Sequence, residues 1–131
     1  MLAKTSAGGL CLGFPDVCLT PMPQPTPVPY PNFGMDPINV AFVPNVLMTC
    51  APAHNVFTTF PPITMGDNPG VATGVASGTV MAPARPVTGA FTVIVGCMPL
   101  ARLTSVTLQN NTNAPGMKIV PSATTVLVLA P

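Results

Sequence analysis

Charge is what this sequence has least of. Its 131 residues include four lysines and arginines and three acidic residues, so 5% are charged, against roughly 25% in an ordinary soluble domain. A net charge of +1 provides no electrostatic footprint for a nucleic acid or an anionic membrane. Disordered tails combine charge with low hydrophobicity, whereas 48% of these residues are hydrophobic. We therefore expect a folded chain with no nucleic-acid partner.

Long apolar runs are also missing. No segment approaches the roughly 18–20 residues of a membrane helix, and the best candidate, residues 126–130, has the length of one strand. Glycines at positions 8 and 9 interrupt any apolar core of a secretory signal. We expect no signal peptide and no integral membrane protein. The chain then stays in the cytoplasm unless a dedicated machine exports it.

Proline and glycine are abundant, with 19 and 11 residues respectively. Prolines spread along the chain nearly exclude a helical bundle. They are densest in residues 15–44, where 21–31 has proline at every second position. Two interpretations of this segment stay open: a flexible linker, or a rigid extended ribbon on a compact body. From residue 45 onwards, short β segments alternate with turn signals. We predict one all-β domain over 1–131 with little or no helix, apart from a short turn within 71–77.

A faint internal repeat is present. Val46–Ala53 parallels Val93–Leu100 at an offset of 47 residues, and both segments contain Cys-x-Pro. Cys18–Pro21 is a candidate for a degenerate third copy. Three copies would imply pseudo-threefold symmetry.

The second copy carries a recognisable motif. Pro99-Leu100-Ala101-Arg102 follows a predicted strand and turn, and it resembles the motif that gives the PAAR family its name. An ordered series of further segments resembles the PAAR-like branch found in type VI secretion clusters; these are residues 14–21, 29–32, 66–67, 74–80, 103–110, 113–116 and 120–122. The resemblance covers nearly the whole chain.

The resemblance implies a compact, cone-shaped domain of short strands and turns with pseudo-threefold symmetry. It also implies a function: one copy caps and sharpens a trimeric VgrG-type spike of a contractile injection machine, and helps to carry effector proteins. Such a tip is assembled in the cytoplasm and exported by the machine itself. Two alternatives stay open, a stand-alone β protein that binds Zn or Cu(I), and the tip of a phage tail spike.

A structural zinc ion is a further question. PAAR tips bind zinc through three histidines and one cysteine, but His54 is the single histidine of this chain. A different tetrahedral set, Cys18, Cys50, His54 and Cys97, would suit zinc. The alternative is that the thiols pack as small hydrophobic groups while His54 bonds to a backbone carbonyl. Cys11, in the glycine-rich lead-in, is the least suitable ligand.

Catalysis finds no support in the sequence. The chain has no glutamate, and Asp67 lies in a Gly-Asp-Asn-Pro-Gly cluster that is typical of a turn. A Cys50–His54 dyad has no neighbour that would orient the imidazole. We therefore expect no enzymatic activity. Arg102 is either a solvated surface residue or a fork that ties turns through backbone carbonyls.

Overall fold

The computed structural model describes residues 1–21, 23–57 and 61–129. The regular secondary structure of these residues is nearly all β, as predicted. The first long strands are β1 (Leu10–Thr20) and β2 (Thr26–Met35), followed by the 3-10 turn η1 (Asp36–Ile38). The remaining strands are β3 (Val43–Met48), β4 (Ala51–Ala53), β5 (Arg85–Pro86), β6 (Ala90–Val95), β7 (Met98–Leu100), β8 (Val106–Gln109) and β9 (Ala114–Val120). The stretch 71–77 contains turns. No helix in these described ranges is long and apolar enough to cross a membrane.

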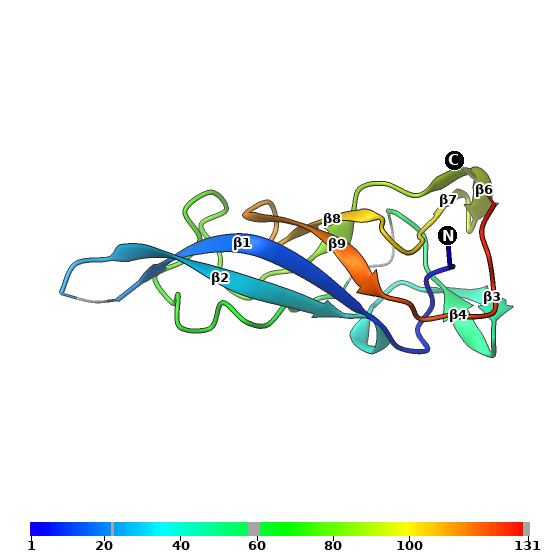
Figure 1. Ribbon diagram of the computed structural model, residues 1–131, viewed down its shortest axis with the longest axis horizontal. Helices are drawn as coiled ribbons and strands as arrows, with labels where there is room; N and C mark the ends of the chain where they lie inside the picture. The colour runs from blue at the N-terminus through cyan, green and yellow to red at the C-terminus, as the bar shows by residue number, and fades with distance from the viewer. Residues whose placement is uncertain (22, 58–60, 130–131) are drawn as a thin grey trace.

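A five-stranded antiparallel sheet forms one part of the molecule, in the order β2-β1-β9-β8-β5. Figure 1 shows that the molecule is elongated along β1 and β2, whose connecting turn projects at one end. β1 contains a bulge between Gly13 and Asp16, where three steps along β1 match two along β2. The extra residue at the bulge reverses which side chains of β1, odd-numbered or even-numbered, face the interior. Cys11 before the bulge and Cys18 after it are therefore both buried.

The proline-rich segment is a ribbon and not a linker. Its residues complete β1 and form β2, with Pro27 opposite Leu19 and Pro29 opposite Val17. β2 is the edge strand of its sheet. Alternate N–H groups of a strand point to opposite edges, so prolines at every second position remove donors from one edge only. The rigid-ribbon interpretation is confirmed.

The predicted repeat consists of two equivalent hairpins. β3 pairs with β4 and β6 pairs with β7, with Leu47 opposite Pro52 in the first and Ile94 opposite Pro99 in the second. Both have a two-residue turn, and both turn residues have positive φ: 53° and 62° at residues 49 and 50, and 62° and 66° at 96 and 97. These values define type I′ turns, the connection that best suits strand twist. The cysteine of each copy is the second turn residue.

The third copy is built from the two chain ends. Leu2 pairs with Leu127, Ala3 N donates to Val126 O at 3.0 Å, and Val128 N donates to Met1 O at 2.6 Å. The prediction that Cys18–Pro21 is the third copy is wrong. Cys18 lies inside β1, paired with Val28 of β2, and forms no comparable turn.

Three backbone hydrogen bonds close a ring among the copies. Lys4 N donates to Ala101 O, Ala101 N donates to His54 O, and His54 N donates to Lys4 O, each at 3.0 Å. Each residue donates its backbone N–H to the carbonyl oxygen of the next, so the three residues occupy equivalent places around one axis. This cyclic arrangement confirms the predicted pseudo-threefold symmetry.

The core around this axis is small. Its buried residues are Ala3, Ala53, Ala90, Val95, Leu100 and Val128, and Val46, Val93 and Val126 pack against it from equivalent positions. Short side chains fit here because three strands converge on one axis.

Most of the few charges are inside. Lys4, Lys118, Asp16, Asp36 and Asp67 are each at most 1% exposed. The Asp36 carboxylate binds both lysines: Lys4 Nζ lies 3.3 Å from Oδ1, and Lys118 Nζ contacts Oδ2. These ion pairs join the N-terminal segment, the end of β2 and the last strand, β9. Charge in this chain therefore contributes to internal structure.

Removing the shared carboxylate should destabilise the fold. Asp36→Ala leaves two ammonium groups buried without a counter-ion, a change that costs about 3–5 kcal/mol in buried pairs. Urea unfolding should show a loss of this size in the free energy of unfolding. Arg85→Gln, at an exposed position, is the matched control and should change the free energy by less than about 0.5 kcal/mol. A variant Asp36→Ala as stable as the control would contradict the assignment.

Candidate functional site

One end of the molecule presents three strand segments around the pseudo-threefold axis. Figure 1 shows β3, β6 and the red C-terminal segment at this end, with β4, β7 and the N-terminal segment one layer further in. Among the described residues, β3 pairs only with β4, β6 only with β7, and 126–128 with 1–3. Each outer segment thus keeps one open edge, which is a template for pairing with another chain. We call β3, β6 and residues 126–128 the threefold base.

Apolar side chains point outward from the threefold base at equivalent positions. Leu47, Ile94 and Leu127 are 62%, 58% and 59% exposed. Their neighbours in sequence pack against the core instead, as strand alternation requires. Three similar apolar groups around one axis form a surface that suits a partner with threefold symmetry.

A second feature is a buried cluster formed by Asp16, Cys18 and Asp67, called the acidic cluster below. One potential ligand atom from each lies within 4.8 Å of the others. Cys18 Sγ is 3.4 Å from Asp16 Oδ1 and 3.8 Å from Asp67 Oδ2. Burial, with the carboxylates of Asp16 and Asp67, raises the pKa of the Cys18 thiol to about 12. Burial is the main cause that raises the pKa of Asp67, and the neighbouring charge of Asp16 also raises it.

Two parts of the chain bring the acidic cluster together. Asp16 and Cys18 are two residues apart on β1 and face the same side of the strand. Asp67 comes from the turn at 66–70, which Gly70 N closes by donating to Asp67 O at 2.9 Å. A Cβ at Gly70 would lie 2.2 Å from Cys18 Cβ, so only glycine allows this approach. Cys18 also bridges to Gly74, which places the segment after the turn along β1.

Side-chain amides surround the Asp16 carboxylate. Asn32 Nδ2 donates to Asp16 Oδ2 at 2.6 Å, Asn110 Nδ2 donates to Oδ1 at 3.3 Å, and Asn113 Nδ2 also donates to Oδ1. On the other carboxylate, Met81 N donates to Asp67 Oδ2 at 3.0 Å. The cluster is therefore held by neutral donors, in contrast to Asp36 with its two lysines.

The predicted Cys₃His zinc set is not assembled. Cys50 and Cys97 are exposed in the hairpin turns, whereas Cys18 is buried in β1. His54, whose backbone belongs to the hydrogen-bonded ring, has a buried side chain. Its Nε2 lies 2.8 Å from Ser6 Oγ, and Asn39 Nδ2 donates to its Nδ1 at 3.2 Å. These partners are side chains and not the backbone carbonyl of the alternative prediction. Repeat-equivalent cysteines do not converge, because the second residue of each turn projects away from the axis.

The Pro99–Arg102 motif contributes to the symmetric framework. Pro99 and Leu100 belong to β7, Ala101 is a member of the backbone ring, and Arg102 pairs with Ala3. The motif therefore marks the place where the second hairpin joins the ring.

The sequence patterns do not mark Asp16 and Asp67 as functional candidates. The Gly-Asp-Asn-Pro-Gly cluster indicates only a turn for Asp67, and the segment 14–21 gives Asp16 no role of its own. The available signal was the Asp-x-Cys spacing at 16–18, which places both side chains on one face of an extended strand. The contribution of Asp67 depends on contacts across 49 residues of sequence, which no local pattern reveals.

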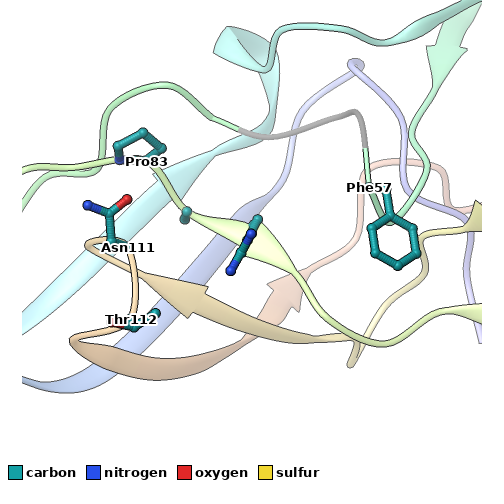
Figure 2. A pocket seen from close by; sticks show the side chains of 6 residues that line it. Phe57, Pro83, Asn111 and Thr112 are labelled. Atoms are coloured by element: carbon teal, nitrogen blue, oxygen red, sulfur yellow. The ribbon is translucent and has the colours of Figure 1, made fainter. Parts of the chain in front are cut away.

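A surface pocket of about 320 Å³ lies beside β5 and belongs to neither feature. Its lining residues are Phe57, Pro83, Ala84, Arg85, Asn111 and Thr112. Figure 2 shows Phe57 on one side and Pro83, Asn111 and Thr112 on the other. Among the described residues of this lining, Arg85 is the one charged side chain.

Comparison with known families gives one result for the chain. The model of the Toxin PAAR-like domain matches residues 9–116, which is more than half of the sequence. No curated protein and no solved structure matches the chain. The zinc ligand set implied by the resemblance to PAAR tips, three histidines and one cysteine, cannot be assembled from a chain with one histidine.

The four thiols should fall into two classes of reactivity. Cys50 and Cys97 are exposed, and Cys11 and Cys18 are at most 1% exposed. We expect the first pair to react with iodoacetamide in the native protein and the second pair only after unfolding, as determined by peptide mass spectrometry. Rapid native labelling of Cys18 would contradict the described burial.

Stability should fall in mild acid because of His54. Burial, and then the Lys4 charge, lower the pKa of His54 from 6.5 to about 3. Between these values the unfolded chain binds a proton that the folded chain excludes, so stability decreases as the pH falls, by up to about 1.4 kcal/mol per pH unit. His54→Gln should remove this slope between pH 6.5 and 4 in urea titrations. The raised pKa of Asp67 acts in the opposite direction in both proteins, so the difference between them isolates His54.

Proposed function

The chain belongs to the Toxin PAAR-like family, and on this premise we propose that it is the structural tip of a trimeric spike in a contractile injection machine. In this role one copy caps a VgrG-type trimer of the type VI secretion system, and the machine exports it together with the spike. The tip also helps to carry effectors attached to the spike. The role is mechanical and requires no enzymatic activity.

The threefold base is the observation that carries this proposal. A trimeric β-helical spike ends in three identical chains, and a single cap must offer each of them an equivalent contact. The base offers three open strand edges around one axis, formed by β3, β6 and residues 126–128. Pairing of an added strand with such an edge is a common mode of recognition. A monomer with this internal symmetry therefore fits a trimer.

The outward side chains support the same role. Leu47, Ile94 and Leu127 are each more than half exposed, and contact with a partner would remove these three apolar groups from water. Burial of one such side chain contributes about 1.5–3 kcal/mol. Three equivalent apolar contacts would therefore add to the strand pairing in stabilising the complex.

The internal construction supports a rigid tip. β1 and β2 form a long proline-containing ribbon that extends away from the base (Figure 1). Proline restricts the unfolded chain and so stabilises a compatible native conformation. The Lys4–Asp36–Lys118 ion pairs fix the ribbon to the base.

Other candidate functions explain less of the structure. A phage tail-spike tip would use the same base, and a purified spike from each system would distinguish the two. A stand-alone Cu(I) buffer needs thiolate and thioether ligands together, whereas the acidic cluster has two carboxylates and one thiol. A stand-alone metal-binding role, for Zn or for Cu(I), does not account for the threefold base.

Docking can be tested with a purified trimeric VgrG-type spike protein. Size-exclusion chromatography with light scattering should show one chain bound per trimer. The triple variant Leu47→Asp, Ile94→Asp, Leu127→Asp loses three apolar contacts and should bind at least about 100-fold more weakly, given the burial free energies above. Binding is measured by calorimetry.

A matched control introduces the same kind of change, an exposed apolar side chain replaced by Asp, away from the threefold base. Val71→Asp and Val75→Asp replace exposed apolar residues of the segment beside β1, and this double variant should bind like the wild type. Equal loss in both variants, or an unchanged affinity of the triple variant, would refute docking through the base. Circular dichroism confirms that each variant is folded.

A further inference from the structure

We propose that Asp16, Cys18 and Asp67 form a structural site for one divalent transition-metal cation of the zinc class. This inference does not rest on the proposed docking function. It concerns a ligand set different from the three histidines and one cysteine that the family resemblance implies, which this chain cannot supply. Two carboxylates and a thiolate would take their place.

The charge distribution is the first argument. Asp36 has two lysines as counter-ions, but within the described residues no lysine or arginine pairs with Asp16 or Asp67. Both carboxylates are fully buried. Two ionised carboxylates in one buried site repel each other and lose hydration. A shared proton or a bound cation would relieve this repulsion.

Unsatisfied oxygen atoms are the second argument. Asp67 Oδ1 and Asn32 Oδ1 are buried and have no hydrogen-bond partner among the described residues. Asn32 borders the cluster directly, because its Nδ2 donates to Asp16 Oδ2 at 2.6 Å. A buried unpaired acceptor costs about 1–3 kcal/mol. A shared proton satisfies one oxygen, whereas a cation can satisfy several acceptors at once.

The spacing of the potential ligands is the third argument. Zn–S bonds of about 2.3 Å and Zn–O bonds of about 2.1 Å at a tetrahedral angle place oxygen and sulfur about 3.6 Å apart. Cys18 Sγ lies 3.4 Å from Asp16 Oδ1 and 3.8 Å from Asp67 Oδ2. Both sulfur-to-oxygen separations are therefore close to those of groups that bind one zinc ion.

The donor types select the metal class. Calcium and magnesium require a shell of oxygen atoms, so a sulfur ligand between two carboxylates disfavours them. Zinc accepts both sulfur and oxygen. On binding, the Cys18 thiol releases its proton to solvent and becomes a thiolate ligand.

The surrounding amides suit the charge of such a site. Two carboxylates and one thiolate around a divalent cation have a net charge of −1. Asn110 Nδ2 lies 3.7 Å and Asn113 Nδ2 3.9 Å from Cys18 Sγ, and both donate to Asp16 Oδ1. Donors of this kind orient ligands and stabilise their charge. Binding would cross-link β1 to the turn at 66–70.

The test is metal analysis of the full chain with matched variants. Protein purified after growth with added zinc should contain about one zinc per chain by elemental mass spectrometry. Cys18→Ser and Asp67→Asn should each weaken zinc affinity at least 100-fold in competition with a chromophoric chelator. Cys97→Ser, which removes an exposed thiol, should bind zinc like the wild type.

A second measurement on the wild type keeps the test independent of variant folding. Removal of the metal with a chelator should lower the melting temperature, and zinc should restore it. Cobalt added to the metal-free chain should give thiolate-to-cobalt charge-transfer absorption with the intensity of a tetrahedral site. Absence of both zinc and the cobalt spectrum would overturn the site in favour of a shared proton. Stoichiometric zinc in Cys18→Ser would show adventitious binding elsewhere and would also overturn it.

Discussion

Lys4 connects the two parts of this molecule. Its backbone N–H and C=O take part in the hydrogen-bonded ring on the pseudo-threefold axis, around which the segments of the threefold base are arranged. Its ammonium group lies 3.3 Å from Asp36 Oδ1 and 3.8 Å from Cys11 Sγ, at the end of β2 and in β1. Burial lowers the pKa of Lys4, and the contact with Cys11 acts in the opposite direction. One residue thereby links the five-stranded sheet to the part of the molecule that holds the threefold base.

This arrangement changes the meaning of the low charge content. A chain with seven charged residues that buries five of them uses charge for internal specificity, as buried ion pairs can do by excluding alternative registers. A one-residue slip of β9 would move Lys118 away from Asp36 and to the opposite face of the sheet. The surface is left almost without charge, which suits a face that a partner covers.

Part of the fold was predictable because it depends on local patterns. The offset of 47 residues appears in the sequence since both hairpins repeat the same strand, turn and Cys-x-Pro order. The third copy was not predictable in the same way, because Leu2 and Leu127 belong to opposite ends of the chain and share no continuous motif. The acidic cluster shows the same limit. Cys18 is a ligand candidate in the sequence, and the Asp-x-Cys spacing places Asp16 on its face of the strand. Asp67, in contrast, reaches the cluster only through a turn 49 residues away.

The threefold base also has a built-in asymmetry. Two of its copies are hairpins whose turns carry Cys50 and Cys97, while the third pairs residues 1–3 with residues 126–128 from distant parts of the sequence. In the proposed docking to a symmetric trimer, the identical corners of the trimer make three rotational settings of the cap equivalent. Because these settings give the same complex, a partner that recognises one side of the asymmetric β1–β2 ribbon would need no fixed register between cap and trimer.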